Sequence, residues 1–270
     1  MAYEVTELNR YPIKSMGQVV LSEAIIDRFG IQMDRRWMVV DEKNRFLTQR
    51  KVAKMTAMSV VEKTCIAGQW ELEISAGGSA QTVSLSTHFS GETISVSVWK
   101  DQCEALVASN DINQWLSEKI GINCRLVFMA DDYHREVDPD YAMAGETVSF
   151  ADGFPLLLTT QASLESFNTH LQRPIKMVRF RPNIVLSGSS PYEEDKWKRI
   201  RVGNMEFSVV KPCSRCVMPT INPQTSAREP EVFKALKAHR AVGRDVFFGQ
   251  NIMPLSEGVV RIGDKVEVLE

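Results

Sequence analysis

The sequence has no marked excess of charge of either sign. Its 32 lysines and arginines are nearly balanced by 34 aspartates and glutamates, which gives the 270-residue chain a formal net charge of −2. Proteins that bind nucleic acid usually carry a basic excess or a basic stripe, so we expect no nucleic-acid partner. A near-neutral total still permits a local site for a small anion.

The sequence also lacks a long apolar run and a recognisable targeting segment. A membrane helix needs about 20 apolar residues, whereas residues 154–158 are among the longest apolar runs here. Residues 1–7 do not show the basic and then apolar regions of a signal peptide. We therefore expect no membrane contact and a cytoplasmic location.

Cysteine is scarce and does not occur in an even set. The five cysteines are Cys65, Cys103, Cys124, Cys213 and Cys216. Three of them are isolated in the sequence. An odd, scattered set favours reduced thiols over a secreted disulfide framework.

Alternation of apolar and polar residues predicts a mainly β fold with a few helices (α+β). Period-two patterns recur through the first hundred residues and return after residue 200, which is typical of an antiparallel sheet or barrel. Turn-like composition at 202–205 and 262–265 predicts two hairpins. Residues 131–147 read as a long surface loop, and a change of pattern near 121–130 suggests two domains, 1–122 and 123–270.

Helical spacing is confined to three segments. Apolar residues recur at helical intervals in 111–120, 161–171 and 231–239. Asp111 and Thr160 are the expected N-terminal caps of the first two. We expect the tryptophans at positions 37, 70, 99 and 115 to belong to the core, and the isolated histidines to be structural or on the surface.

Residues 213–216, Cys-Ser-Arg-Cys, are the motif that most suggests chemistry. A thiolate is a nucleophile and a soft metal ligand, and a cation such as Arg215 lowers the pKa of an adjacent thiol. The motif could be half of a zinc site, a dithiol redox pair, a loop presenting one reactive thiolate, or two ordinary buried cysteines. The scattered histidines and cysteines offer no second half-site for zinc. Flanking prolines disfavour the helix on which redox pairs usually lie.

Four other clusters place polar side chains at sharp backbone features. They are Tyr11-Pro-Ile-Lys-Ser15, Asp34-Arg-Arg-Trp37, Asp152-Gly-Phe-Pro155 and Phe180-Arg-Pro-Asn183. Cations at strand ends could clamp a phosphate, and an arginine offers it two parallel donors. Taken singly, each cluster is also compatible with a solvated charge or a strand-end ion pair.

In this order, the clusters resemble the family built on the MOSC domain, which is named for the C-terminal domain of molybdenum cofactor sulfurases. More narrowly, they resemble its amidoxime-reducing branch, which includes the mitochondrial amidoxime-reducing component and bacterial YcbX. The resemblance covers nearly the whole chain. It also takes in residues 48–50, 222–225 and 248–251. Each segment is weak alone, but their joint order and spacing are specific.

The resemblance implies a β-rich N-terminal MOSC-associated domain (1–122), a MOSC β-barrel (123–270) and a molybdenum–molybdopterin cofactor between them. It implies that Cys216 ligates the metal and is catalytic. The matching cofactor contacts are Lys14, Ser15, Arg35, Asp152, Gly153, Arg181, Asn183, Ser214 and Arg215. The first three would hold the phosphate and pterin end, since an anionic cofactor needs cations and donors. Arg215 is expected to keep Cys216 ionised, and Cys213 to support the loop.

The resemblance further implies an oxidoreductase that removes oxygen from N-hydroxylated compounds. The chain shows neither the iron–sulfur motif of YcbX nor the membrane anchor of the mitochondrial member. Electrons are therefore expected from a separate protein, such as a ferredoxin, a flavin reductase or a b-type cytochrome.

A function other than reduction is also compatible with these residues. The alternative is a cofactor carrier, or a sulfur carrier with a persulfide on Cys216. Pyridoxal phosphate is not expected, because no lysine has a Schiff-base context. Gly153 and Phe154 stand where the mitochondrial protein has small hydroxyl residues, so hydrogen bonds there should differ.

Overall fold

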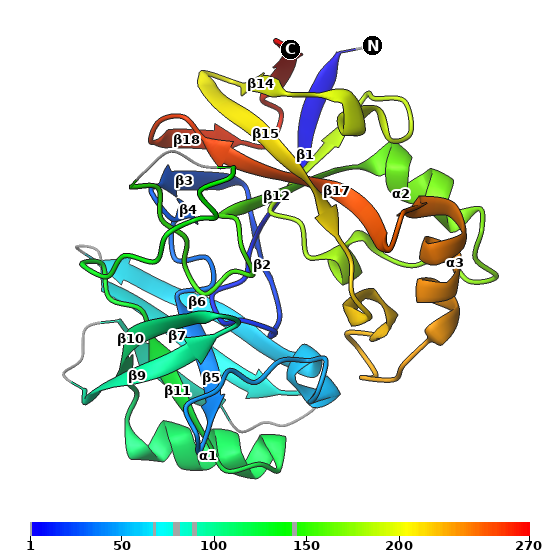
Figure 1. Cartoon of the computed structure of the whole chain (residues 1–270). Helices are drawn as coiled ribbons and strands as arrows, with labels where there is room; N and C mark the ends of the chain where they lie inside the picture. The colour runs from blue at the N-terminus through cyan, green and yellow to red at the C-terminus, as the bar shows by residue number, and fades with distance from the viewer. Residues whose placement is uncertain (1, 67–68, 78–81, 88–90, 142–144) are drawn as a thin grey trace.

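The computed structural model describes residues 2–66, 69–77, 82–87, 91–141 and 145–270, and its central element is a closed barrel of seven strands (Figure 1). In order around the barrel, these strands are β12 (Leu156–Thr160), β13 (Ile184–Ser187), β1 (Tyr3–Arg10), β19 (Lys265–Val268), β14 (Arg199–Val202), β15 (Met205–Ser214) and β17 (Asp245–Pro254). Pairing of β12 with β17 closes the barrel. Neighbours run antiparallel except β12 and β13, which are parallel. The mainly β prediction is confirmed.

The first strand, β1, is one of the strands of the barrel, although the other barrel strands come from the C-terminal half of the sequence. In β1, Glu4 pairs with Ser187 of β13 on one side and with Lys265 of β19 on the other. Two short strands flank the barrel: β2 (Val19–Leu21), which pairs with β1, and β16 (Ala241–Val242), which pairs with β17. The two chain ends therefore lie together at one end of the molecule in Figure 1.

The rest of the N-terminal half forms smaller sheets beside the barrel. One contains β5 (Trp37–Asp41), β11 (Cys124–Phe128), β10 (Asp101–Val107) and β9 (Thr93–Val98). A second contains β6 (Met58–Ile66), β7 (Gln69–Ala76) and β8 (Thr82–Ser86). A third joins the late strand β18 (Gly258–Arg261) to β3 (Glu23–Asp27) and β4 (Gly30–Ile31). Strand pairing thus ties the two halves of the sequence together.

All three predicted helices are present, with small differences at their ends. The helix α1 (Asn110–Ile120) has Ser109 at its N-cap, so the expected cap at Asp111 is wrong, because the helix starts one residue earlier. The helix α2 (Gln161–Asn168) has the expected cap, since the Thr160 hydroxyl accepts a hydrogen bond from the backbone N–H of Ser163. It ends three residues earlier than predicted. The third helix is α3 (Pro230–Arg240).

Four 3₁₀ turns complete the described secondary structure. They are η1 (Ala53–Ala57), η2 (Met177–Phe180), η3 (Glu193–Lys196) and η4 (Met218–Thr220). Two of them, η2 and η4, lead into segments that line the cleft described below. No helix in the described ranges is long and apolar enough to cross a membrane.

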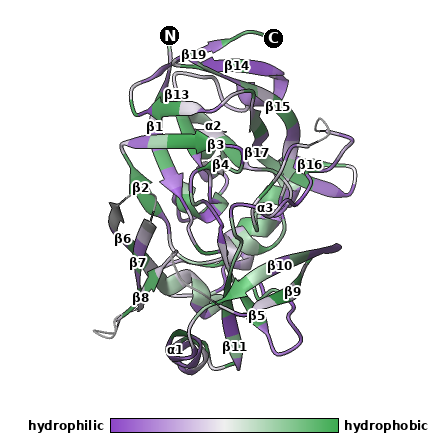
Figure 2. Ribbon diagram, turned by 90° about the vertical axis from the view of Figure 1, so that its left-hand side faces the viewer, coloured by the Kyte–Doolittle hydropathy of each residue, from purple (hydrophilic) through white to green (hydrophobic). Residues whose placement is uncertain are grey.

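Separate hydrophobic clusters fill the barrel and its surroundings. In Figure 2, β1 and β13 carry hydrophobic stretches where they pass through the barrel. Outside it, α2 packs on the barrel wall through Phe167 and α3 packs through Val232 and Leu236, in a cluster that also contains Phe180 and Phe248. Burial of such aromatic side chains is a large favourable term in folding.

Three local predictions need correction. The turn at 202–205 is a hairpin, because Val202 pairs with Met205, but the turn at 262–265 joins strands with different partners, since glycine and aspartate specify a turn and not a pairing. The segment 131–147 is not wholly a surface loop, since Arg135 and Val137 are buried. Trp37 and Trp70 belong to the core as expected, whereas Trp99 is 48% exposed.

Candidate active site

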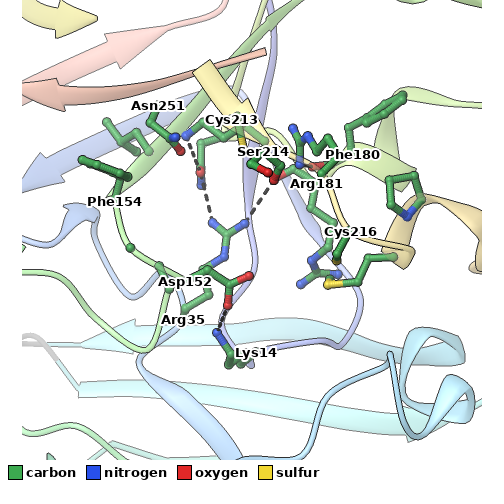
Figure 3. Close-up of a pocket in the computed structure, with 18 of the residues that line it drawn as sticks. Lys14, Arg35, Asp152, Phe154, Phe180, Arg181, Cys213, Ser214, Cys216 and Asn251 are labelled. Atoms are coloured by element: carbon green, nitrogen blue, oxygen red, sulfur yellow. Dashed lines mark hydrogen bonds and ion pairs between the residues drawn. The ribbon is translucent and has the colours of Figure 1, made fainter. Parts of the chain in front are cut away.

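A cleft with a volume of about 290 Å³ lies where the barrel meets the N-terminal region (Figure 3). Every residue predicted to hold the cofactor lines it: Lys14, Ser15, Arg35, Asp152, Gly153, Arg181, Asn183, Ser214, Arg215 and Cys216. In Figure 3, Lys14 and Asp152 lie on one side, and Cys213 and Ser214 lie opposite at the end of β15. The structure thus brings these residues together, while their individual roles stay predictions.

The backbone adopts unusual conformations at three of these positions. Ser15, Arg35 and Arg181 all have positive φ, at 71°, 50° and 57°. Residues other than glycine adopt this region at a cost of order 1 kcal/mol or more, and such strain gathers at binding sites. At Arg35 the conformation is held by a hydrogen bond from its N–H to the carbonyl of Tyr11, at 2.8 Å. The local fold therefore serves side-chain placement at the cleft.

An ion pair between Lys14 and Asp152 lies on one side of the cleft. The ammonium group of Lys14 is buried and donates to the carbonyl of Phe150 at 2.6 Å and to Asp152 Oδ1 at 2.5 Å. Burial lowers the pKa of Lys14, and the carboxylate partly offsets this. Burial alone would raise the pKa of Asp152, but the lysine charge and hydrogen bond outweigh it and bring that pKa well below its ordinary value. The Asp152 carboxylate is therefore ionised throughout the neutral range.

Arg35 is held in place by three acceptors. It is paired with the fully buried Asp34, and it donates to Asn183 Oδ1 at 3.0 Å and to the carbonyl of Arg181 at 3.1 Å. Asn183 in turn accepts from the N–H of Leu157 and donates to the carbonyl of Asn9. The amide of Asn183 is thus occupied within the protein, and it orients Arg35 across the cleft.

Two further guanidinium groups keep unused donors. Arg181 donates to the carbonyl of Met16 at 2.6 Å and lies over the Tyr11 ring, while Arg215 donates to the carbonyls of Phe248 and Phe180. Within the described residues, Nη2 of each is buried without a hydrogen-bond partner. Burial lowers the pKa of Arg181 to about 10, which leaves it charged at neutral pH. Unpaired buried donors carry a cost that an anionic ligand would remove.

The sequence suggests that the guanidinium of Arg215 lies beside Cys216. In the structure, the guanidinium beside Cys216 belongs to Arg50 instead. Nη1 of Arg50 lies 3.7 Å from Cys216 Sγ. The donors of Arg215 turn toward two backbone carbonyls instead. Adjacency in sequence misled here because both residues follow the end of β15 at Ser214, where no regular strand sets the direction of their side chains. Cys216 is partly exposed and is a free thiol.

The remaining members of the motif have different environments. Burial raises the pKa of the Cys213 thiol, which therefore stays protonated at neutral pH. The Ser214 hydroxyl donates to Asp245 at 3.3 Å. Around Gly153 there is open space, so a side chain would fit there without a clash. All four cysteines whose side chains the structure describes are free, and the side chain of Cys65 lies outside that description.

Several lining residues were missing from the predicted set. They include Thr48, Arg50, Phe154, Arg179, Lys211 and Asn251. Arg50 and Asn251 belong to segments that carry the family resemblance. The resemblance therefore pointed to these segments, although it predicted no contact for either residue. Arg179 is already paired, with Glu229 at 2.6 Å. Arg50 is the important omission, because it touches the sulfur.

Comparison with known proteins agrees with this arrangement. The model of the MOSC N-terminal beta barrel domain matches residues 2–123, and the model of the MOSC domain matches residues 145–267. Mitochondrial amidoxime-reducing component 1 of Mus musculus is 29% identical over 98% of this chain and 82% of its own length. The protein of that name from Homo sapiens is 27% identical over the same shares.

Two further similarities are more distant. Molybdenum cofactor sulfurase of Danio rerio is 28% identical over 88% of this chain, which corresponds to 30% of that longer protein. The crystal structure of the YuaD protein of Bacillus subtilis covers 98% of this chain and 94% of that one, with 11% identity and a TM-score of 0.44, too low to carry an argument. The two domain models and the relatives show that this chain is a MOSC-domain protein with a MOSC N-terminal barrel domain, distantly related to the mitochondrial amidoxime-reducing components.

Proposed function

We propose that this protein binds a molybdenum–molybdopterin cofactor in the cleft and reduces N-hydroxylated compounds, with Cys216 as the metal ligand. The observation that carries the proposal is that the Cys216 thiol lies in one cleft together with several cationic side chains, among them Lys14, Arg35, Arg50, Arg181 and Arg215. Relatives named as amidoxime-reducing components match nearly the whole chain and support the same activity.

The donor set fits such a cofactor. A phosphorylated pterin dithiolene is anionic, and the unpaired Nη2 atoms of Arg181 and Arg215 are donors that anions satisfy. Molybdenum accepts thiolate ligands, and Cys216 offers a free sulfur. Lys14, Ser15 and Arg35 would hold the phosphate and pterin end from one side. Asp152, Gly153, Arg181, Asn183, Ser214 and Arg215 would complete the contacts.

When bound, the cofactor would supply two-electron oxygen-atom removal, so that an N-hydroxylated substrate, two electrons and two protons give the amine or amidine and water. The chain's own residues position these reactants. Arg50 places a positive charge and an N–H donor beside the Cys216 sulfur. The Lys14–Asp152 pair fixes the opposite wall of the cleft. We propose that a separate protein, a ferredoxin, a flavin reductase or a b-type cytochrome, delivers the electrons.

A matched pair of cysteine variants tests the proposal. The protein is reconstituted with cofactor and a chemical reductant, and consumption of an amidoxime and bound molybdenum are measured. Cys216→Ala should lose more than about 100-fold in turnover, because removal of a ligand costs more than loss of its supporting contacts. Cys213→Ala, three residues away, should keep most activity. Full turnover in Cys216→Ala, or none in the wild type, would contradict the proposal.

A second candidate function uses the same thiol differently. Cys216 is partly exposed in a cationic cleft, and one relative is a molybdenum cofactor sulfurase, so the protein could carry the cofactor or hold sulfur as a persulfide. Mass spectrometry of the purified protein separates the two. A persulfide on Cys216, with cofactor bound and no reduction of any amidoxime, would favour the carrier.

A further inference from the structure

A second and larger cavity adjoins the cleft on the side of the four-stranded sheet. Its volume is about 980 Å³, and it shares Thr48, Arg50, Asp152 and Gly153 with the cleft. The two spaces are therefore neighbours, and the side chain that touches Cys216 lines both of them. This second cavity is called here the Trp99 groove.

Trp99, in the wall of this groove, occupies a costly conformation. It lies in the tight turn between β9 and β10 with φ at +56° and its side chain 48% exposed. Glycine or asparagine is the ordinary choice for such a turn, and a bulky residue with positive φ is an outlier. Neither burial nor turn geometry explains a tryptophan here. Backbone strain of this kind is a reason to look for a binding role.

The contacts of Trp99 link it to both sides of the cleft. Its indole N–H donates to Asp152 Oδ1 at 3.2 Å, and the Arg50 guanidinium lies 4.3 Å from the ring centre. Arg50 in turn lies beside Cys216, and Asp152 is paired with Lys14. The ring of Phe46 packs against the indole at 5.1 Å. These contacts fix the indole ring in the groove wall, and Arg50 links it to the sulfur.

Inside the groove, the buried charge is already neutralised. Arg135 is buried and donates to Asp101 at 2.8 Å and to the carbonyls of Ser149 and Ala151. The apolar lining residues are Phe46, Trp99, Val137 and Pro139. Exposed charges of both signs, on Lys51, Lys100 and Glu136, lie at the rim. These walls suit a flat, uncharged group better than a strongly charged one.

We propose that the Trp99 groove is a subsite for the non-reacting part of the substrate, and that it selects an aryl or similarly flat group. The inference rests on the proposed reduction of N-hydroxylated compounds for the identity of the reacting end. Trp99 would contact the substrate, and it would also act as a positioning residue by holding Arg50 and Asp152. An aryl amidoxime would place its ring against Trp99 and its N–O group toward Cys216.

A binding experiment without electrons tests the subsite. Benzamidoxime and acetamidoxime, which share the reacting group and differ in the ring, are titrated into the full-length protein by calorimetry in the absence of reductant. The wild type should bind benzamidoxime roughly tenfold more tightly, as expected for one aromatic contact with its buried area. Trp99→Ala should abolish this preference, and Trp99→Phe should keep most of it.

Two further variants distinguish loss of the Trp99 contact from a general loss of folding or binding. Trp115→Phe changes a tryptophan on α1 outside both cavities and should behave as the wild type. Trp99→Leu keeps an apolar side chain of intermediate size for use if the alanine variant does not fold, and it should lose most of the preference. An unchanged preference in Trp99→Ala, or no preference in the wild type, would overturn the proposal.

The outcome is separable from that of the reductase proposal. Binding that depends on Trp99 in a protein without amidoxime turnover would sink the reductase alone and leave the groove as an aryl-binding site. Turnover that depends on Cys216, together with an aryl preference that survives Trp99→Ala, would sink the subsite alone. In a reducing assay, Trp99→Ala should raise KM for benzamidoxime more than it raises KM for acetamidoxime.

Discussion

Two pairs of arginines in this protein lie in contrasting surroundings. Arg36 and Arg135 support the segment that follows β11, and both are buried. Arg36 donates to the carbonyl of Met129 and pairs with Asp131 at 2.9 Å. Arg135 donates to Asp101 and to the backbone around residue 150. Their charges and donors are used within the protein, which is the pattern of a structural cation.

Arg181 and Arg215 differ because each leaves one buried nitrogen unpaired and lines the cleft. An unpaired donor alone does not mark a site, since Arg10 also has an unpaired Nε although it pairs with Glu62 far from the cleft lining. The combination of unused donors, a cavity and a neighbouring thiol is what distinguishes the cleft pair. The comparison shows that an unpaired donor on an arginine indicates a binding site only where the arginine also lines a cavity.

The largest predicted effect is a loss of folding stability when a structural arginine is replaced. Arg135→Met should lower the free energy of unfolding by about 3–5 kcal/mol, because it leaves Asp101 and several carbonyls without their buried partner. Urea denaturation measures this. Arg45→Met, which breaks an exposed pair with Asp41, is the control and should cost less than about 1 kcal/mol. Equal losses in the two variants would break the distinction.

A cleft arginine should show the opposite behaviour. Arg181→Gln should lower molybdenum retention roughly tenfold to a hundredfold, since one hydrogen bond to a charged group is worth about 1.5–3 kcal/mol. The unfolding free energy should change much less than in Arg135→Met. Elemental analysis after cofactor loading gives the first quantity. Arg201→Gln, on an exposed barrel strand, should retain the metal, and full retention in Arg181→Gln would argue against a cofactor contact.

The Lys14–Asp152 pair predicts a dependence of stability on pH. The folded-state pKa of Asp152 lies below its unfolded-state value, near 3.9. Its contribution to stability is therefore present above about pH 4 and is lost as the pH falls toward the folded-state value. Asp152→Asn should lose less stability than the wild type between pH 5 and pH 3, measured by urea midpoints. Parallel pH profiles would show that the pair contributes nothing.

The smallest stability effect is expected at Trp99. Trp99→Gly relieves a positive φ, but it also loses the Arg50 contact and the hydrogen bond to Asp152. These terms are each of order 1 kcal/mol and opposite in sign, so thermal unfolding should shift by only a few degrees. A large drop in the unfolding temperature would make Trp99 a structural residue after all.

Much of the barrel could be predicted because its strands alternate in sequence. The start of helix α2 was predicted correctly from local signals, since Thr160 is a cap whose partner lies three residues away. The pairing of β1 with β13 and β19 was beyond such signals, because it joins residues more than 170 positions apart. Local chemistry specifies turns and caps, whereas partner choice depends on the whole chain.

At the site, the predicted residues lie together, but the neighbour of Cys216 and the environment of Trp99 differ from the prediction. The sequence placed Arg215 beside Cys216, and the structure places Arg50 there. Trp99 was predicted to belong to the core because aromatic side chains are usually buried. Nothing in the sequence indicates its exposure or its backbone conformation. Side-chain direction at bends is set by three-dimensional packing, which a linear motif does not encode.

The placement of β1 has a consequence for biosynthesis. Because Glu4 pairs with Lys265, strand β1 must wait until residue 265 has left the ribosome before the ring of strands can close. The closed barrel would hold residues 14 and 35 against residue 216 only after that point. Insertion of a cofactor into the completed cleft would therefore follow the synthesis of β19, and it would require a chain kept from aggregating while one edge of β1 is unpaired.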